Sequence, residues 1–180
     1  MPQRHRFILV TGGARSGKSR FAVGLAKRLG RRVIYLATGA ATDEEMRSRI
    51  ARHRAQRPRA WRTIESPDDP ARAITRLTGA VDGLLMDCLT MYVSMLLVRG
   101  ETDRAIERRV RELCEAIRRA RCPVILVTNE VGMGVVPATA LGRRFRDLAG
   151  LANQIAAGVA DEVYLLVAGL PLRIKPAGEP

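Results

Sequence analysis

Cysteine, histidine and aromatic residues are all scarce in this chain of 180 residues. It has three cysteines, none in a Cys-x-x-Cys pair, and two histidines. This number and spacing argue against a disulfide framework or a zinc site, and favour buried free thiols in a reducing compartment. The three Phe, three Tyr and one Trp are not interleaved with basic residues. The sequence therefore offers no stacking platform for nucleic acid, and we expect no nucleic-acid partner.

Long apolar runs are also missing. The longest, over residues 84–98, contains Asp87 and Cys88, and it falls short of the roughly 20 residues of a membrane span. The basic start of the chain is not followed by an apolar segment with a cleavage site, so no signal peptide is predicted. We therefore expect a cytoplasmic protein with no membrane span.

Positive charge dominates what is present. Lys and Arg number 31 against 18 Asp and Glu, a formal net charge of +13, and no acidic residue precedes Asp43. Such a surplus attracts acidic ligands, although a generally Arg-rich surface would give the same number. The hydrophobic fraction of 47% suffices for a real core, and the length predicts one domain over residues 1–180.

Short β-rich runs alternate with longer helical periods, which predicts an α/β fold with a mostly parallel sheet flanked by helices. Strands are expected over residues 7–11, 33–38, 83–87, 123–129 and 162–167, and a short extended piece over residues 61–65. Helices are expected over residues 18–29, 43–57, 70–79, 90–98, 103–120 and 139–158. A final edge strand over residues 172–175 should be antiparallel, because the connection before it is too short for a crossover.

Local patterns add detail to three of these helices. Thr42 with Glu45 predicts a capping box at the start of the 43–57 helix. Apolar residues at helical spacing predict the core-facing sides of the first and last helices. These residues are Phe21, Leu25 and Leu29 on the first helix, and Leu141, Phe145, Leu148 and Ala152 on the last.

The strongest motif is G-x-x-x-x-G-K-S over Gly12–Ser19, directly after the first strand and directly before the first helix. This context is the one that a phosphate-binding loop (P-loop) requires. Its glycines let backbone N–H groups converge on phosphate oxygens at a helix N-terminus. Lys18 would neutralise β- and γ-phosphate charge, and Ser19 would coordinate Mg²⁺. The predicted fold is therefore P-loop NTPase-like.

An acidic residue ends another expected strand. Asp87 closes the run Gly83–Asp87, and the carboxyl ends of strands in such sheets face the ligand crevice. An acid at this place acts on Mg²⁺ in P-loop proteins, whereas an ordinary helix cap is the alternative. Together the two motifs predict a nucleoside triphosphate with Mg²⁺, but not the reaction.

His53 lies in a run of arginines on the expected 43–57 helix. Arg49 and Arg57 are four residues away on either side and share its face. Surrounding cations lower the proton affinity of an imidazole, and a neutral histidine can attack phosphorus. A solvated face of an Arg-rich protein would contain the same residues, so the pattern alone leaves both interpretations open.

Several blocks together resemble one family. They include Val10–Ser19, Asp43–His53, Arg57–Glu65, Thr128–Pro137 and Leu141–Gly150. Through them the chain, from Ile8 to Lys175, is similar to the bifunctional adenosylcobinamide kinase and adenosylcobinamide-phosphate guanylyltransferase of cobalamin biosynthesis. The resemblance implies that ATP or GTP phosphorylates the hydroxyl of adenosylcobinamide. It also implies that a histidine takes GMP from GTP and passes it to adenosylcobinamide phosphate, giving adenosylcobinamide-GDP.

The resemblance further implies the site residues and a homotrimer. The nucleophilic histidine matches His53, and the metal ligands would be Ser19 and Asp87. Glu65 would either read the guanine edge or orient the histidine. The positions that bind nucleotide match Gly12, Gly13, Ala14, Arg15, Ser16, Gly17, Lys18, Ser19, Ala37, Thr38, Gly39, Arg54, Ala55, Gln56, Arg57, Glu65 and Asp87.

Three other function classes compete with this hypothesis. An ordinary P-loop kinase explains the phosphate-binding loop and Asp87, but it leaves His53 idle. It also leaves without a role the glycine-rich segment Asn129–Pro137, which follows a strand and is expected at the ligand edge. A nucleic-acid ATPase would use the positive charge but lacks stacking residues. A regulatory module without turnover would not need an intact set of Lys18, Ser19 and Asp87.

Overall fold

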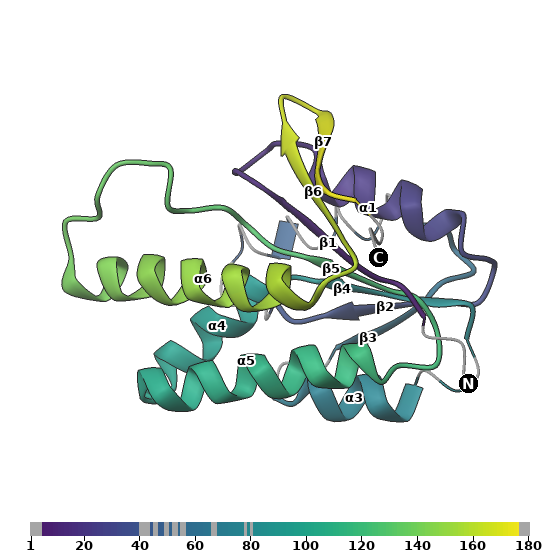
Figure 1. Cartoon of the computed structure of the whole chain (residues 1–180), viewed down its shortest axis with the longest axis horizontal. Coiled ribbons are helices and arrows are strands. Elements are labelled where there is room, and N and C mark those ends of the chain that lie inside the picture. Colours follow the sequence, from purple (N-terminus) through teal and green to yellow (C-terminus); the bar gives the residue numbers. More distant parts are fainter. Residues whose placement is uncertain are drawn as a thin grey trace.

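A computed structural model describes residues 5–39, 44, 47–48, 51, 54, 57–65, 68–77, 79 and 81–176. Its centre is a seven-stranded sheet with the order β3-β2-β4-β5-β1-β6-β7 (Figure 1). The strands are β1 (Phe7–Gly12), β2 (Val33–Ala37), β3 (Arg62–Glu65), β4 (Gly83–Asp87), β5 (Val124–Val127), β6 (Glu162–Val167) and β7 (Leu170–Lys175).

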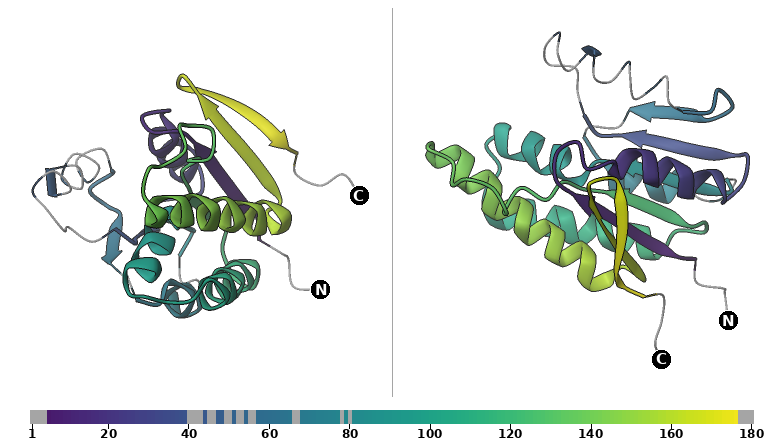
Figure 2. Two further views of the ribbon diagram at one scale, coloured as in Figure 1. Left: turned by 90° about the vertical axis from the view of Figure 1, so that its left-hand side faces the viewer. Right: turned by 90° about the horizontal axis from the view of Figure 1, so that it is seen from above.

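Every neighbouring pair of strands in this sheet is parallel except β6 and β7. The expected antiparallel edge strand is therefore confirmed. It begins at Leu170, two residues earlier than predicted, because Ala168 and Gly169 turn the chain with φ angles of 51° and 84°. Such left-handed residues allow pairing to start directly after a two-residue turn. This hairpin stands at one edge of the sheet, with β3 at the other (Figure 2).

Five helices cover the sheet in the described part of the chain. They are α1 (Lys18–Lys27), α3 (Pro70–Leu77), α4 (Leu89–Val98), α5 (Asp103–Arg118) and α6 (Ala140–Val159). Side chains of α1 share one buried cluster with the sheet, and side chains of α3, α4, α5 and α6 share the other. The sheet is thus covered on both faces, as the apolar strands predict.

Alternation along β1 shows how one strand serves both clusters. Phe7 and Leu9 pack toward α4, α5 and α6, whereas Ile8 and Val10 pack toward α1. All four side chains are at most 5% exposed. A strand buried on both faces carries no polar residue to alternate with, so it appears in the sequence as an unbroken apolar run.

Two predicted core faces differ in part from the structure. On α6, Leu148 and Ala152 are buried, but Leu141 is 56% exposed, because the first turns of this helix extend past the carboxyl ends of the strands (Figure 1). On α1 the fully buried residues are Ala22 and Ala26, while Phe21, Leu25 and Leu29 are partly buried around the same cluster. The small alanines bring the helix close to the sheet, and the larger side chains fill its flanks.

The predicted 43–57 helix is described only at isolated positions. Residues 44, 47, 48, 51 and 54 have helical backbone. The capping pair Thr42 and Glu45, together with His53, Ala55 and Gln56, lies outside the described residues.

All three cysteines are free and buried, as predicted. Burial raises the pKa of the Cys88 and Cys122 thiols to about 11, and that of Cys114 to about 12. Among the described residues, no helix is both long enough and apolar enough to cross a bilayer.

Candidate active site

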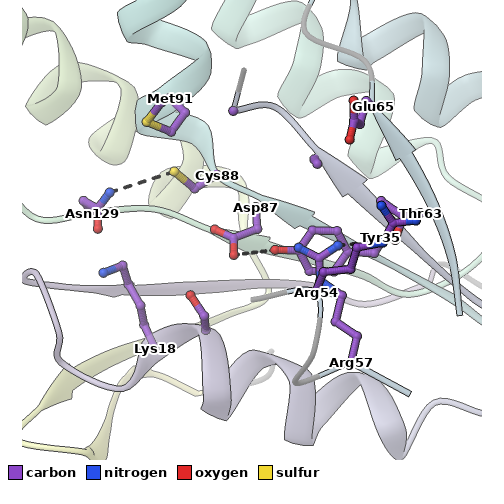
Figure 3. Close-up of a pocket in the computed structure, with 13 residues that line it drawn as sticks. Lys18, Tyr35, Arg54, Arg57, Thr63, Glu65, Asp87, Cys88, Met91 and Asn129 are labelled. Atoms are coloured by element: carbon purple, nitrogen blue, oxygen red, sulfur yellow. Dashed lines mark hydrogen bonds between the residues drawn. The ribbon is translucent and has the colours of Figure 1, made fainter. Parts of the chain in front are cut away.

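The carboxyl ends of five parallel strands open onto one pocket (Figure 3). It encloses about 840 Å³ of space, counting the open solvent at its mouth. Its lining is Lys18, Ser19, Tyr35, Ala37, Gly39, Arg54, Arg57, Thr63, Glu65, Asp87, Cys88, Met91 and Asn129. Eight of these thirteen are residues that the sequence predicted: Lys18, Ser19, Ala37, Gly39, Arg54, Arg57, Glu65 and Asp87.

The phosphate-binding loop (Gly12–Ser19) contributes Lys18 and Ser19 to the lining of this pocket. Gly17, with φ of 91°, caps α1 without any side-chain hydrogen bond, so the helix N-terminus is open toward an anion. The Ser16 hydroxyl is buried and has no hydrogen-bond partner among the described residues. Lys18 is 7% exposed, and its Nζ donates to the Gly13 carbonyl over 3.0 Å. The ammonium is thereby folded back over the loop, where it can meet phosphate oxygens.

Residues Gly12–Gly17 do not line the pocket with side chains. Their backbone is held in place instead: the Gly169 N–H donates to the Ser16 carbonyl over 3.0 Å, and the Glu130 N–H donates to Gly12 over 3.0 Å. A Cβ at Gly12 would lie 2.7 Å from the Leu166 carbonyl oxygen. This close packing favours glycine at position 12 independently of any ligand contact.

Asp87 is held by a tyrosine that the sequence analysis did not single out. The Tyr35 hydroxyl donates to Asp87 Oδ2 over 2.6 Å. Burial, together with the Asp87 charge, raises the pKa of Tyr35 far above its ordinary value, so the hydroxyl stays protonated as a donor. The Arg57 guanidinium lies 3.2 Å above the centre of the Tyr35 ring, and its Nη1 donates to Thr63 over 3.3 Å.

Thr38 has a different position from its neighbours Ala37 and Gly39. It is 2% exposed and bridges two strand ends: its hydroxyl donates to the Cys88 carbonyl over 2.7 Å and accepts from the Cys88 N–H over 2.8 Å. Thr38 therefore fixes the spacing between the ends of β2 and β4 and is not part of the pocket lining, whereas Ala37 and Gly39 line the pocket.

The part of the pocket next to β3 contains both acidic and basic side chains. Glu65 ends this strand, is exposed, and is paired in register with Ala37 of β2. Arg54 and Arg57 complete this end. A carboxylate and two guanidinium groups offer both acceptors and donors to a base and to phosphates.

The oxygen ligands in the pocket suit Mg²⁺. Ser19 provides a hydroxyl and Asp87 a carboxylate, both in the lining. Mg²⁺ in nucleotide sites is commonly bound through one or two protein oxygens, with substrate phosphates and waters completing the shell. The residues present therefore fit a magnesium–nucleotide complex.

Five lining residues escaped the sequence analysis as individual positions: Tyr35, Thr63, Cys88, Met91 and Asn129. Tyr35 lies in an apolar strand, where the sequence pattern predicts a core residue. Asn129 is the first residue of the segment Asn129–Pro137, which the sequence analysis expected at the ligand edge, and it lines the pocket.

Comparison with known proteins identifies the group to which these features belong. The profile of a family described as cobinamide kinase / cobinamide phosphate guanyltransferase matches residues 8–174. The bifunctional adenosylcobalamin biosynthesis protein CobU of Salmonella typhimurium is 44% identical over 180 residues, which cover 93% of this chain and 99% of that protein.

Two further relatives agree with this match. CobU of Escherichia coli is 42% identical over 180 residues, covering 93% of this chain and 99% of its own. The bifunctional adenosylcobalamin biosynthesis protein CobP of Pseudomonas aeruginosa is 45% identical over 172 residues, covering 96% and 98%. The predicted resemblance is confirmed, and the chain belongs to the cobinamide kinase / cobinamide phosphate guanyltransferase family.

Proposed function

We propose that this chain, as one nucleotide-binding domain over residues 1–180, performs two successive transfers on a corrinoid. It phosphorylates the hydroxyl of adenosylcobinamide with ATP or GTP, and it then attaches GMP from GTP to give adenosylcobinamide-GDP. The observation that carries the proposal is the single pocket that joins Lys18 of the phosphate-binding loop, Asp87, and the Arg54–Glu65 end.

In the kinase step, the chain's own contribution is to bind and orient the triphosphate. Backbone N–H groups of the phosphate-binding loop and the Lys18 ammonium neutralise the β- and γ-phosphates. Ser19 and Asp87 would hold Mg²⁺, which supplies further neutralisation of phosphate charge when bound. Such electrostatic positioning supplies most of the rate enhancement in phosphoryl transfer.

In the guanylyltransferase step, His53 is the nucleophile. Its ring nitrogen bonds to the α-phosphorus of GTP, the bond from that phosphorus to the bridging oxygen breaks, and pyrophosphate leaves. A phosphate oxygen of adenosylcobinamide phosphate then attacks the same phosphorus and the P–N bond breaks. His53 lies outside the described residues, but its neighbour Arg54 lines the pocket, which supports a place for this segment at the site.

Glu65 supplies base selectivity in this proposal. Its carboxylate can accept from N1–H and N2–H₂ of guanine. It stands at the same end of the pocket as Arg54 and Arg57.

The enzyme works in the cytoplasm as a homotrimer. Family resemblance suggests this assembly, and exposed apolar residues on the edge strand β7 support self-association: Leu170, Leu172 and Ile174 are 73%, 56% and 55% exposed. Light scattering on the purified protein should give three times the 19.8 kDa chain mass.

The deciding experiment is the intact mass of the protein after incubation with GTP and Mg²⁺. Wild type should gain one GMP, stable to base and labile to acid as a phosphoramidate is. His53→Ala should gain none, whereas His5→Ala, which changes the other histidine, should behave as wild type. If His53→Ala still formed the adduct, the assignment of the nucleophile would be wrong.

A further inference from the structure

Asn129 occupies the place where the two parts of the phosphoryl-transfer site meet. Strand β5 lies between β1, which leads into the phosphate-binding loop, and β4, which ends at Asp87. The last residue of β5, Val127, is paired with Asp87. The chain then continues beside the loop, since Glu130 donates its N–H to the Gly12 carbonyl. Asn129, which lies between Val127 and Glu130 in the chain, is therefore flanked by the phosphate-binding loop on one side and by the strand end at Asp87 on the other.

Hydrogen bonds determine which end of the Asn129 amide faces the pocket. Its Nδ2 donates to Thr90 Oγ1 over 2.9 Å and lies 3.9 Å from Cys88 Sγ. Its backbone N–H also donates to Thr90, and its carbonyl accepts from Asn153 over 3.0 Å. Thr90 is 2% exposed, so this support is rigid. With the nitrogen held there, the amide oxygen is directed away from Cys88 on the pocket side (Figure 3).

An amide oxygen can only accept hydrogen bonds, and this limits what it can bind. Phosphate oxygens are acceptors as well, so they make poor partners for it. Apart from a cation, which an amide oxygen can also coordinate, its partner must bring an O–H or N–H to this point. In the kinase reaction the nucleophile is an alcohol, whose hydroxyl must lie beside the γ-phosphoryl group, between the phosphate-binding loop and Asp87.

We propose that Asn129 Oδ1 accepts a hydrogen bond from the attacking hydroxyl of the corrinoid alcohol, an inference that rests on the proposed kinase function. The hydroxyl oxygen bonds to the γ-phosphorus, the bond from that phosphorus to the β–γ bridging oxygen breaks, the nucleoside diphosphate leaves, and the proton is released to water. The amide is too weak a base to keep the proton. Asn129 therefore aligns the nucleophile, and Thr90 is a positioning residue that acts through it.

The two activities of the enzyme provide an internal control. Formation of the GMP adduct needs GTP but no alcohol, so loss of the hydroxyl contact should affect one reaction only. We expect Asn129→Ala to lower kcat for phosphorylation of adenosylcobinamide by about 10–100-fold, the range for a misplaced reactant. The rate of GMP-adduct formation at saturating GTP should stay within about twofold of wild type, since transition-state stabilisation there is unchanged.

Thr90 variants test the support of the amide. Thr90→Val removes the acceptor of Nδ2 and lets the amide rotate, so the kinase kcat should fall by about fivefold with KM for ATP unchanged. Thr90→Ser keeps the hydroxyl and should restore wild-type kinase activity. Thermal melting of each variant identifies any that fails to fold.

Two results would overturn the proposal. Equal losses of kinase activity and adduct formation in Asn129→Ala would show that the side chain serves nucleotide binding or the fold. An unchanged kinase kcat in the same variant would show that it does not touch the hydroxyl. A wild-type protein that forms the adduct but phosphorylates no adenosylcobinamide would overturn the kinase half of the proposed function itself, and this inference with it.

Discussion

The hydroxyl of Tyr35 controls the position of the carboxylate that is proposed to face Mg²⁺. Because burial keeps this hydroxyl protonated, it donates to Oδ2 of Asp87 over 2.6 Å and fixes the orientation of the carboxylate. We predict that Tyr35→Phe lowers the kinase kcat about tenfold and raises the Mg²⁺ concentration needed for half-maximal rate. A hydrogen bond to a charged group, worth about 1.5–3 kcal/mol, accounts for a loss of this size.

The matched control for this variant is Tyr164→Phe. The Tyr164 hydroxyl donates to Glu162 over 2.7 Å, which is the same chemistry away from the pocket lining. Kinase rates across a Mg²⁺ series should be normal in Tyr164→Phe. Equal losses in the two variants would mean that a general loss of stability, and not the position of Asp87, lies behind the effect.

Gly17 predicts a second residue-scale effect, on stability. Its φ of 91° is unfavourable for a side chain, and an added Cβ would lie 3.2 Å from the Gly169 Cα. Gly17→Ala should lower the free energy of unfolding by about 1–2 kcal/mol. Gly13→Ala, in the same loop, meets no atom within 4 Å and should change it by less than about 0.5 kcal/mol. Urea unfolding without nucleotide measures both, and similar values would contradict the backbone explanation.

At this scale, the sequence could reveal only chemistry that is local in the chain. Gly12–Ser19 are consecutive, so their motif is visible without a fold. Tyr35 and Asn129 acquire their roles only because β4 is adjacent to both β2 and β5. That adjacency joins Tyr35 to Asp87, 52 positions apart, and Asn129 to Thr90, 39 positions apart, and no local pattern encodes it.

Among the elements, the start of β2 depends on one carboxylate. Asp82 accepts the backbone N–H groups of Arg31 and Arg32 over 3.0 and 2.9 Å, and also binds the Arg32 guanidinium. These hydrogen bonds, above all the one from the Arg32 backbone, hold the pKa of Asp82 below its usual value. A depressed pKa means that the stabilisation is complete above the unfolded-state pKa of about 4 and is lost as the pH falls through the folded-state value.

We therefore predict that Asp82→Asn lowers Tm at pH 7, and that the gap to wild type closes below about pH 4. Asp147→Asn is the control, since Asp147 pairs only with the adjacent Arg146 among the described residues. Calorimetry over a pH series gives both differences. A gap for Asp82→Asn that persisted into acid would contradict a role for the ionised carboxylate.

The elements themselves were largely predictable, and their ends less so. Apolar runs such as Val124–Val127 identify strands because burial on both faces leaves no alternation. The burial of a helix face could not be predicted at its ends. Leu141 fits the periodic stripe of α6, yet it is exposed, because the length of sheet beneath a helix is set by other segments of the chain.

At the scale of the molecule, Glu162 joins segments near both ends of the described chain. This carboxylate is 2% exposed and accepts from Arg6, Arg173 and the Tyr164 hydroxyl. We predict that Glu162→Gln lowers the free energy of unfolding by about 1–3 kcal/mol, because its partners lose a charged acceptor. Both arginines are about half exposed, so solvent screening keeps the effect below that of a fully buried pair.

Chemical unfolding tests this prediction, with kinase and adduct assays at 25 °C expected to be normal. Glu112→Gln is the control, because Glu112 faces Arg108 across 3.8 Å on the exposed side of α5, and such pairs contribute little. If Glu162→Gln were no less stable than Glu112→Gln, Glu162 would not be the link between the two ends.

The order of the strands in the sheet could not be predicted from the sequence. The runs in β1, β2, β4 and β5 are all short and apolar, so each could pair with any other by composition alone. The position of β5 between β1 and β4 follows from how the helices pack on both faces at once. The parallel class and the antiparallel edge were predictable, because connection lengths limit both.

Burial of every cysteine has a practical consequence for labelling the protein with a fluorophore. With pKa values of about 11 to 12, the native thiols contain almost no thiolate at pH 7. We therefore expect them not to react with maleimide dyes. Val135, 94% exposed in the segment between β5 and α6, is then a free choice for a single added cysteine. A fluorophore attached there would report changes in this segment when substrate binds, while the native cysteines stay unlabelled.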